Sequence, residues 1–392
     1  MPKKNIKKIM VIFGTRPEAI KMAPLVHELK KYEEFNVYVC VTAQHRQMLD
    51  QVLKIFDIQP DFDLNIMKDR QTLVDVTTRA LNGLDKVMKE VKPDMVLVHG
   101  DTTTTFVGGL AALYNQVAIG HVEAGLRTNN KYSPFPEEMN RQLTGVIADL
   151  HFAPTKLASN NLRIENKPEN TIFLTGNTVI DAQKTTIRKD YNHPLLDEIS
   201  GLKMVLMTAH RRENLGEPMH NIFRAIYRLV EQHQDIAVVY PVHMNPIVKE
   251  AAENILGNHS RIKLIDPLDV IDFHNFMAQS HLILTDSGGI QEEAPALGIP
   301  VLVLRDTTER SEGIISGTLK LAGTDEDVIF NLANELLTNK ESYLEMSQAT
   351  NPYGDGEASR RIAEALLYYF DLQFNKPQAF DEEELNKEVY VK

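Results

Sequence analysis

Short apolar segments alternate with segments of helical periodicity along most of the chain. Residues 8–13, 37–42, 95–99, 117–122 and 171–174 are apolar runs typical of buried strands. Between two of them, apolar residues recur every three or four positions at Leu73, Val76, Ala80, Leu84, Val87 and Val91. This spacing predicts one buried face of a helix, which Pro93 ends. Strands that alternate with helices predict parallel βαβ units.

The alternation stops over residues 177–203, where charges, His193-Pro194 and Gly201 are mixed, and then resumes. We therefore predict an α/β fold with two doubly wound Rossmann-like domains, residues 1–176 and 204–356, facing a central cleft and joined by a linker. A last helix over 357–370 is expected to pack back on the first domain. The acidic residues 371–392 are expected to form a loosely attached tail.

Composition narrows the class of protein. The 392 residues suit two domains, and 54 acidic against 42 basic residues give a net charge of −12, which argues against a nucleic-acid partner. The single cysteine, Cys40, cannot form an internal disulfide, which favours the reducing cytosol. The apolar run 9–13 is too short for a signal peptide, and no run is long enough to span a membrane. We expect a cytoplasmic protein with no membrane partner.

The strongest candidate for ligand binding is Thr285-Asp-Ser-Gly-Gly-Ile-Gln-Glu-Glu293, which follows a strand and opens a helix. The small residues Ser287, Gly288 and Gly289 allow a diphosphate to approach backbone N–H groups. Glu293 follows Ser287 by roughly 9 Å of helix, about the reach from a diphosphate to its ribose. The alternative is a Ser N-cap with acidic first-turn residues, which explains the acids but not the paired glycines.

Three further loops carry basic residues after strands. Arg16 and Lys21 lie in Gly14-Thr-Arg-Pro-Glu-Ala-Ile-Lys21, and the other two loops are Thr208-Ala-His-Arg-Arg-Glu-Asn214 and Arg305-Asp-Thr-Thr-Glu-Arg310. Arginine and lysine can hold phosphate, and His210 can transfer a proton near neutral pH. Each loop could instead be a solvated turn. Neither a Walker loop nor a dinucleotide fingerprint occurs, so no nicotinamide cofactor is expected.

Carboxylates follow the strands of the first half. Asp101 could instead be a helix cap and Glu137 a first-turn residue, whereas Glu123, between an apolar stretch and a glycine turn, is harder to explain structurally. Three acids at one sheet edge predict an acid/base group. No His-Glu-x-x-His motif or cysteine cluster predicts a metal site. The pairs Asp61-Phe-Asp63 and Asp325-Glu-Asp327 are interpreted as structural. The Gly-x-Ser-x-Gly turn that would carry a serine nucleophile does not occur in the sequence.

Together these segments resemble the non-hydrolysing UDP-N-acetylglucosamine 2-epimerases over residues 7–370. The resemblance rests on the segments already quoted and on His99-Gly-Asp-Thr-Thr-Thr-Thr105, His121-Val-Glu-Ala-Gly-Leu-Arg127 and Pro134-Phe-Pro-Glu-Glu138. It implies a two-domain glycosyltransferase-B-type fold, a homodimer, and interconversion of UDP-N-acetylglucosamine and UDP-N-acetylmannosamine without a cofactor. In bacteria this reaction feeds surface polysaccharide synthesis.

The resemblance also implies residue roles. Asp101, Glu123, Glu137 and His210 would be catalytic, and UDP or the sugar would contact Arg16, Lys21, Arg141, Phe273, Ser287, Gly288, Gly289, Glu293 and Arg310. Some bacterial members bind a second UDP-N-acetylglucosamine as an activator. The matching residues here are Gln44, His45, Gln47, Arg70, Gln71, Arg211 and His243.

The chemistry that we expect is elimination of UDP to 2-acetamidoglucal, followed by re-addition with a proton delivered to the opposite face of C2. Which carboxylate is the base stays open. Two alternatives use the same fold: a UDP-sugar glycosyltransferase and a hydrolysing 2-epimerase. A third is a non-catalytic sensor of the nucleotide sugar.

Overall fold

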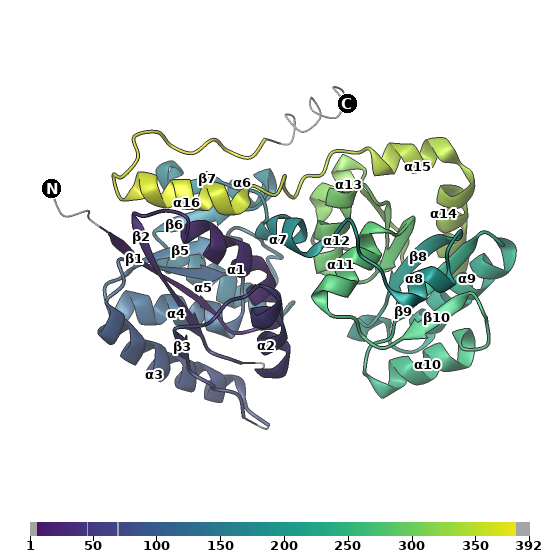
Figure 1. The fold of residues 1–392 in the computed structure, drawn as a ribbon, viewed down its shortest axis with the longest axis horizontal. Coiled ribbons are helices and arrows are strands. Elements are labelled where there is room, and N and C mark those ends of the chain that lie inside the picture. The colour runs from purple at the N-terminus through teal and green to yellow at the C-terminus, as the bar shows by residue number, and fades with distance from the viewer. Residues whose placement is uncertain (1–5, 45, 69, 382–392) are drawn as a thin grey trace. The chain divides into compact units, whose positions relative to one another are not determined.

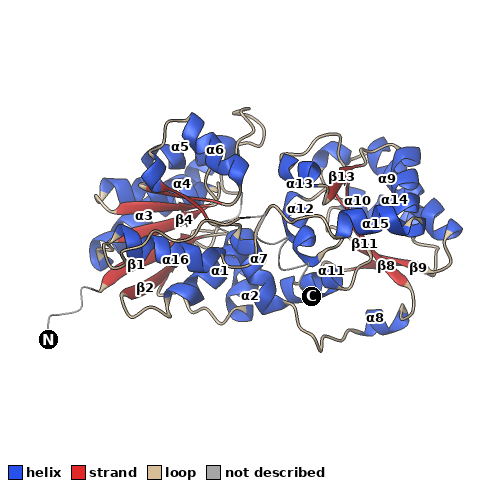
Figure 2. Cartoon of the chain, turned by 90° about the horizontal axis from the view of Figure 1, so that it is seen from above, coloured by secondary structure: helices blue, strands red, loops and turns tan. Residues whose placement is uncertain are grey.

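The computed structural model describes residues 6–44, 46–68 and 70–381, and it divides into two compact units (Figure 1). Unit 1 comprises residues 6–184 and 353–381 of the described chain, and unit 2 comprises residues 185–352. Each unit contains one sheet in which every strand pairing is parallel, with helices on both faces (Figure 2). The predicted fold class, two doubly wound α/β domains, is confirmed.

Unit 1 is built on a seven-stranded sheet of order β3-β2-β1-β4-β5-β6-β7. Its strands are β1 (Lys7–Phe13), β2 (Phe35–Val41), β3 (Phe62–Asp63), β4 (Met95–His99), β5 (Ala118–Val122), β6 (Leu150–Ala153) and β7 (Ile172–Leu174). Its helices are α1 (Arg16–Leu29), α2 (Arg46–Ile55), α3 (Leu73–Val91), α4 (Thr103–Tyr114), α5 (Glu137–Ile147), α6 (Lys156–Ile164), α7 (Thr178–Thr186) and α16 (Ala358–Tyr369), with a short 3-10 turn at Glu169–Thr171. The expected apolar face of α3 is buried from Val76 to Val91.

Unit 2 has a six-stranded sheet of order β10-β9-β8-β11-β12-β13. Its strands are β8 (Lys203–Thr208), β9 (Ile236–Pro241), β10 (Ile262–Ile265), β11 (Leu282–Thr285), β12 (Val301–Val303) and β13 (Leu319–Leu321). Its helices are α8 (Pro194–Glu198), α9 (Glu217–Gln232), α10 (Pro246–Leu256), α11 (Val270–Ala278), α12 (Gly288–Glu293), α13 (Ser311–Ser316), α14 (Glu326–Thr338) and α15 (Lys340–Ser347), with 3-10 turns at Arg212–Asn214 and Ala294–Leu297.

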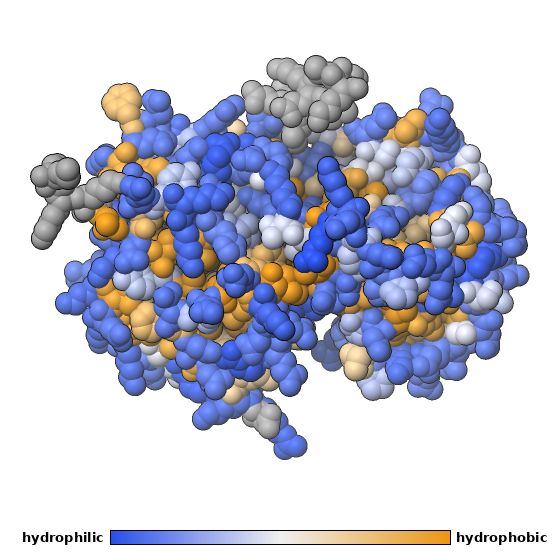
Figure 3. Space-filling view, viewed as in Figure 1, coloured by the Kyte–Doolittle hydropathy of each residue, from blue (hydrophilic) through white to orange (hydrophobic). Residues whose placement is uncertain are grey.

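The strands of unit 2 read as continuous apolar runs because both faces of the sheet are covered. Val205 and Met207 enter a core cluster under α9, α10 and α14, whereas Met204 and Leu206 enter a second cluster on the opposite face. This is the burial expected of a parallel sheet between two helical layers. On the face that Figure 3 displays, each unit carries mainly hydrophilic residues outside these cores.

The segment predicted to be a linker, 177–203, is largely folded. Helix α7 contains the point at which the chain passes from unit 1 to unit 2, and α8 follows it. The chain therefore does pass between the units within the predicted linker, but the prediction missed these two helices because the mixed charges hide their short helical signal. Asp181, one of those charges, is buried and accepts hydrogen bonds from the backbone of Ala358 (3.2 Å) and Ser359 (2.7 Å) at the start of α16.

Helix α16 belongs to unit 1 and packs against α1. The predicted loose tail was wrong for residues 371–381: Phe380 is buried, and its N–H donates to the carbonyl of Leu174 at the edge of the sheet (2.9 Å). Residues 382–392 of the tail prediction lie outside the described part of the chain. No helix among the described residues is long and apolar enough to cross a membrane.

Candidate active site

Each sheet has one point at which the strand order reverses, and the candidate residues gather there. In unit 1 the reversal lies between β1 and β4, which lead into the Gly14–Lys21 segment and into Asp101. In unit 2 it lies between β8 and β11, which lead into His210 and Ser287. Open parallel sheets bind ligands in the crevice outside such a point, so each unit has its own candidate site.

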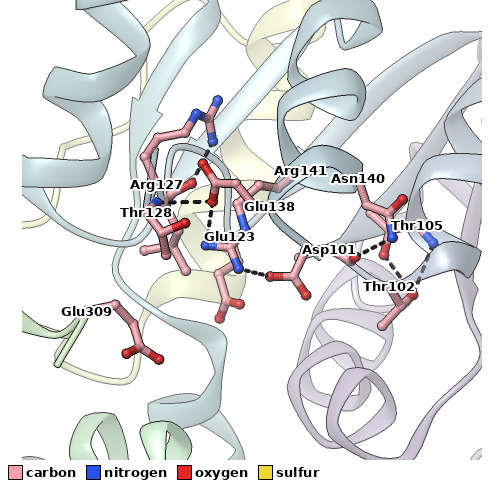
Figure 4. A network of polar contacts seen from close by, with 12 residues as sticks. Asp101, Thr102, Thr105, Glu123, Arg127, Thr128, Glu138, Asn140, Arg141 and Glu309 are labelled. Carbon is pink, nitrogen blue, oxygen red and sulfur yellow. Dashed lines mark hydrogen bonds and ion pairs between the residues drawn. The ribbon is translucent and has the colours of Figure 1, made fainter. Parts of the chain in front are cut away.

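Asp101 is held by an arginine that we expected to contact substrate. The Arg141 guanidinium lies 2.6 Å from the Asp101 carboxylate and 3.5 Å from Glu138, between the two acids (Figure 4). Burial raises the pKa of Asp101, Arg141 lowers it, and the negative charges of Glu123 and Glu137 raise it again. The structure therefore brings the three predicted acid/base residues into one electrostatic cluster, and it makes Arg141 a partner of Asp101.

Glu123 lies at the centre of the second group of contacts in unit 1. Lys21 forms an ion pair with it, and the Asn177 side chain donates a hydrogen bond of 3.0 Å. Glu123 has a φ of +61°, a left-handed backbone conformation that is unusual outside glycine and often marks a functional position. Lys21, expected near phosphate, thus contacts a carboxylate in this structure.

His99 contributes a neutral imidazole beside the same carboxylate. Its Nε2 lies 3.6 Å from Glu123, and burial lowers the pKa of His99 to about 4, against a smaller opposite effect of Glu123. Within the described residues, this Nε2 has no hydrogen-bond partner. A buried polar atom without a partner is uncommon, so it has a hydrogen bond to offer to a ligand or water.

Glu137 and Glu138 begin helix α5 but have different surroundings. Glu137 is partly exposed, whereas Glu138 is fully buried and accepts hydrogen bonds from the backbone of Thr128 and Asn129, both at 3.0 Å. Glu138 therefore fixes the loop that precedes α5, and Glu137 keeps access to solvent. Of these two glutamates, only Glu137 is open to a reacting group.

A buried carboxylate that sequence reasoning missed joins the loops that carry Arg16 and Asp101. Glu18, 2% exposed, accepts hydrogen bonds from the backbone N–H groups of Gly14 (3.1 Å) and Thr15 (2.9 Å). Its other oxygen accepts from the hydroxyls of Thr102 (2.8 Å), which directly follows Asp101, and of Thr105 (3.2 Å) in the first turn of α4. The Thr15-x-x-Glu18 spacing of a capping box was the available signal.

In unit 2, the paired glycines have neighbours that explain their size. A Cβ on Gly288 would lie 3.2 Å from the Arg310 guanidinium carbon, and one on Gly289 would lie 3.4 Å from a Glu293 carboxylate oxygen. Because Gly288 has no side chain, the Arg310 guanidinium can pack against its backbone. Gly289 in the same way avoids a close contact with the Glu293 carboxylate. Ser287 precedes helix α12 as its N-cap residue.

Arg310 is fixed by two carboxylates. Its Nε and Nη2 donate to Glu292 at 3.0 and 2.9 Å, and its Nη1 donates to Glu309 at 2.7 Å. Burial acts to raise the pKa of Glu309, but Arg310 and Arg305 outweigh it and lower the value to about 2. The guanidinium is thus held in a preset orientation, and its partner Glu292 was not among the predicted site residues.

His210 is held by Asp286. The backbone N–H groups of His210 and Arg211 both donate to one Asp286 oxygen at 2.8 Å, and the His210 Nδ1 lies 3.6 Å from the other. The ring stacks on His243, with centroids 5.3 Å apart. Burial lowers the pKa of His210, Asp286 raises it, and His243 and Arg211 lower it again.

The remaining predicted residues are divided between the units. Arg16 is the first residue of α1, and Phe273 on α11 packs partly against the core of unit 2. Among the predicted activator residues, Arg211 and His243 meet around His210, whereas Gln44 contacts Thr104 and Gln71 contacts Lys68 and Arg79. Gln47 is in α2, Arg70 precedes α3, and His45 lies outside the described residues.

Comparison with known proteins gives consistent results. The family model described as UDP-N-acetylglucosamine 2-epimerase matches residues 27–367. The UDP-N-acetylglucosamine 2-epimerase of Bacillus subtilis is 67% identical over 373 residues, covering 95% of this chain and 98% of that protein. That of Escherichia coli is 53% identical over 370 residues, covering 92% and 98%.

Solved structures are similar over the same length. Staphylococcus aureus MnaA with UDP has a TM-score of 0.88 at 57% identity, covering 96% of this chain and all of that one. The Neisseria meningitidis UDP-GlcNAc 2-epimerase bound to UDP-GlcNAc has a TM-score of 0.85 at 48% identity, covering 92% and 99%. The chain belongs to the UDP-N-acetylglucosamine 2-epimerase family.

Proposed function

We propose that the chain interconverts UDP-N-acetylglucosamine and UDP-N-acetylmannosamine by eliminating UDP and adding it back. The observation that carries this proposal is that the charges of Glu123 and Glu137 act on the buried Asp101 beside the strand-order reversal of unit 1. Related structures support the ligand: the Neisseria enzyme binds UDP-GlcNAc, and the Methanocaldococcus jannaschii enzyme, 34% identical, binds UDP-GlcNAc and UDP.

The route follows from the acidity of the reacting carbon. C2 of the sugar has no neighbouring carbonyl, so a carboxylate acting alone cannot remove its hydrogen at a useful rate. When the C1–O bond to UDP breaks, positive charge develops at C1 and the C2 hydrogen becomes removable. The product pair is 2-acetamidoglucal and UDP. Re-addition of UDP to C1, with a proton placed on the other face of C2, completes the inversion.

The acid/base work is assigned to unit 1. Two of the three carboxylates exchange protons with C2, one on each face of the sugar. The burial that raises the pKa of Asp101 brings that group closer to neutral pH, where a proton donor is most effective. Arg141 and Glu138 keep Asp101 and the loop before α5 in place. His99 offers its unpaired Nε2 beside Glu123.

Binding of UDP is assigned to unit 2. Ser287, Gly288 and Gly289 hold the diphosphate, Glu293 accepts from the ribose hydroxyls, and Phe273 lies beside the uracil. Arg310, already oriented by Glu292 and Glu309, stabilises the negative charge of the departing UDP, together with Arg16 of unit 1. His210 donates a hydrogen bond to phosphate or, in its imidazolium form, transfers a proton to it.

The test is turnover in D2O followed by proton NMR. We expect deuterium at C2 of the product, because the hydrogen removed from C2 exchanges with solvent while the glucal is held. Quantitative retention of the original hydrogen would rule the route out. The same spectra separate the alternatives: a glycosyltransferase does not isomerise the nucleotide sugar, and a hydrolysing enzyme releases free N-acetylmannosamine with UDP.

We also propose the remaining family properties for this chain: a cytoplasmic role in surface polysaccharide synthesis, activation by a second UDP-N-acetylglucosamine, and a homodimer. Helices α4 and α5 pack side by side, and their C-terminal ends expose Leu113, Tyr114, Leu143 and Val146, by 41 to 70% of each residue. Such an exposed apolar group supports an interface. Light scattering should give a dimer for the wild type and a monomer for Val146→Glu.

A further inference from the structure

The chain that leaves α7 is fastened to one face of helix α11. The Asn275 side chain donates to the carbonyl of Thr186 (2.8 Å) and accepts from the N–H of Arg188 (2.9 Å). One turn away, the Tyr191 hydroxyl donates to Asp272 (2.7 Å). Because Thr186 and Asn275 are both buried, this attachment is a fixed part of unit 2.

His274, the neighbour of Asn275, connects this attachment to Glu293. The ring is 2% exposed, its Nδ1 lies 2.6 Å from the Thr186 hydroxyl oxygen, and its Nε2 lies 3.3 Å from a Glu293 carboxylate oxygen. A carboxylate oxygen only accepts hydrogen bonds, so the arrangement favours a ring that carries its hydrogen on Nε2. Thr186 fixes one side of the ring, and the other side faces Glu293.

The contact decides which way the Glu293 carboxylate faces. A glutamate has three rotatable side-chain bonds, and losing that freedom on binding weakens affinity. In this structure Oε2 is directed to His274, while Oε1 lies beside Gly289, where a Cβ would come within 3.4 Å. One carboxylate oxygen is therefore held by His274, and the other lies beside Gly289.

We propose that His274 is a positioning residue that holds Glu293 ready for the ribose hydroxyls and thereby makes the site select ribonucleotides over 2′-deoxyribonucleotides. This inference rests on the proposed function, in which Glu293 accepts from the ribose. The energetic reason is that a carboxylate aimed at two hydroxyls is left with an unmade hydrogen bond when one hydroxyl is absent. A carboxylate free to turn away loses that discrimination.

The experiment measures the affinities of UDP and 2′-deoxy-UDP by calorimetry for the full-length chain. We expect the wild type to favour UDP by about tenfold or more, the value of one hydrogen bond to a charged group. The amide nitrogen of His274→Gln reaches about as far as Nε2 and should keep most of the preference. His274→Asn reaches only as far as Nδ1, so it should bind both nucleotides within about twofold.

The controls separate this inference from the proposed function. Glu293→Gln should lose the preference for UDP over 2′-deoxy-UDP. If this variant keeps the preference, Glu293 does not bind the ribose, and the proposed function fails at that residue. If Glu293→Gln loses the preference and His274→Asn keeps it, the inference is overturned. It is also overturned if His274→Asn weakens both nucleotides equally, which a purely structural role predicts.

Two further variants keep the test decisive. If His274→Asn does not fold, Thr186→Val takes its place, because it removes the hydroxyl that fixes the ring and nearly preserves side-chain volume. It should reduce the preference for UDP by an intermediate factor. An unchanged preference in Thr186→Val overturns the inference. His281→Asn is the matched control, because this partly buried ring of unit 2 stacks on Tyr343, with centroids 4.3 Å apart. Its preference should equal that of the wild type.

Discussion

Removing the Glu18 carboxylate should loosen the turn that carries Arg16 and the turn that carries Asp101 together. Glu18 accepts hydrogen bonds from two backbone N–H groups and from three threonine hydroxyls, including that of Thr15 at 2.8 Å. Burial raises the pKa of Glu18, and these hydrogen bonds act in the opposite direction. The informative pair of variants is Glu18→Ala and Glu18→Gln.

The loss of stability in Glu18→Ala depends on which of the donors to Glu18 can find another acceptor. The Thr105 hydroxyl has the His99 carbonyl oxygen at 2.5 Å as another acceptor, and the Thr102 hydroxyl lies 3.1 Å from that of Thr105. The N–H groups of Gly14 and Thr15 lose their acceptor, at about 1–3 kcal/mol each, offset in part because no carboxylate remains to be buried. We expect a loss of about 3 kcal/mol for Glu18→Ala.

The glutamine variant should lose much less. Its amide oxygen can accept from the same two N–H groups, and its amide nitrogen can donate to threonine hydroxyls that turn to accept. We expect a change of about 1 kcal/mol or less. The difference between the two variants therefore measures the backbone hydrogen bonds rather than the charge.

The assay is site-resolved hydrogen exchange, since a chain of two units need not unfold in one step. In Glu18→Ala the amides of Gly14 and Thr15 should exchange about a hundredfold faster, and turnover should fall with them. Asp325→Ala, which removes the exposed cap of α14, is the control and should leave both unchanged. If Glu18→Ala loses no more protection at these amides than the control, the reasoning is refuted.

Three further predictions concern single groups. Asp101→Asn should lower turnover by about a hundredfold or more while the affinity for UDP, measured by calorimetry, stays nearly constant; normal turnover would leave Asp101 a structural role only. Burial lowers the pKa of three histidines of unit 1 to between about 3 and 4: His99, His121 and His151. Each pKa in the folded state lies below the unfolded value near 6.5, so the unfolded chain takes up these protons first as the pH falls. The free energy of unfolding is therefore undiminished above pH 6.5 and decreases as the pH falls towards 4. Each histidine should cost about 2 kcal/mol of unfolding free energy between pH 7 and pH 5, and His151→Gln should show a shallower decline in urea titrations. Burial raises the pKa of Cys40 to about 12, so a thiol reagent should react with it only after urea unfolds the chain, and fast reaction with folded protein would contradict that burial.

The fold was predictable because the chain repeats one pattern that both sheets require. Strands buried on two faces read as uninterrupted apolar runs, and the core clusters on either side of β8 explain why. The same reasoning failed between 177 and 203, where the helical signal is short. The interpretation of Asp325 as structural is confirmed, because its side chain accepts from the N–H groups of Asp327 and Val328 at the start of α14.

The candidate site was predictable where one residue follows one strand. Strand ends in a parallel sheet share an edge, so a residue that follows a strand can be placed there from the sequence. Such residues are Asp101, Glu123 and Ser287. The residues that hold them were not predictable: His274 meets Glu293 across 19 positions of sequence, and Asn177 meets Glu123 across 54. Pairings of this kind depend on tertiary distances for which a single sequence carries no periodic signal.

The division of the chain also sets the order in which its parts can be completed during synthesis. Unit 2 is one continuous stretch, 185–352, whereas unit 1 needs residues 353–381 to supply α16 and the backbone contact at β7. The ribosome therefore releases every residue of the second unit before the last pieces of the first. The first 184 residues leave the tunnel early, with the surface that α16 covers still exposed, and must wait until residues 353–381 have been made. A nonsense mutation before residue 353 would consequently damage unit 1, most of which is encoded at the opposite end of the gene.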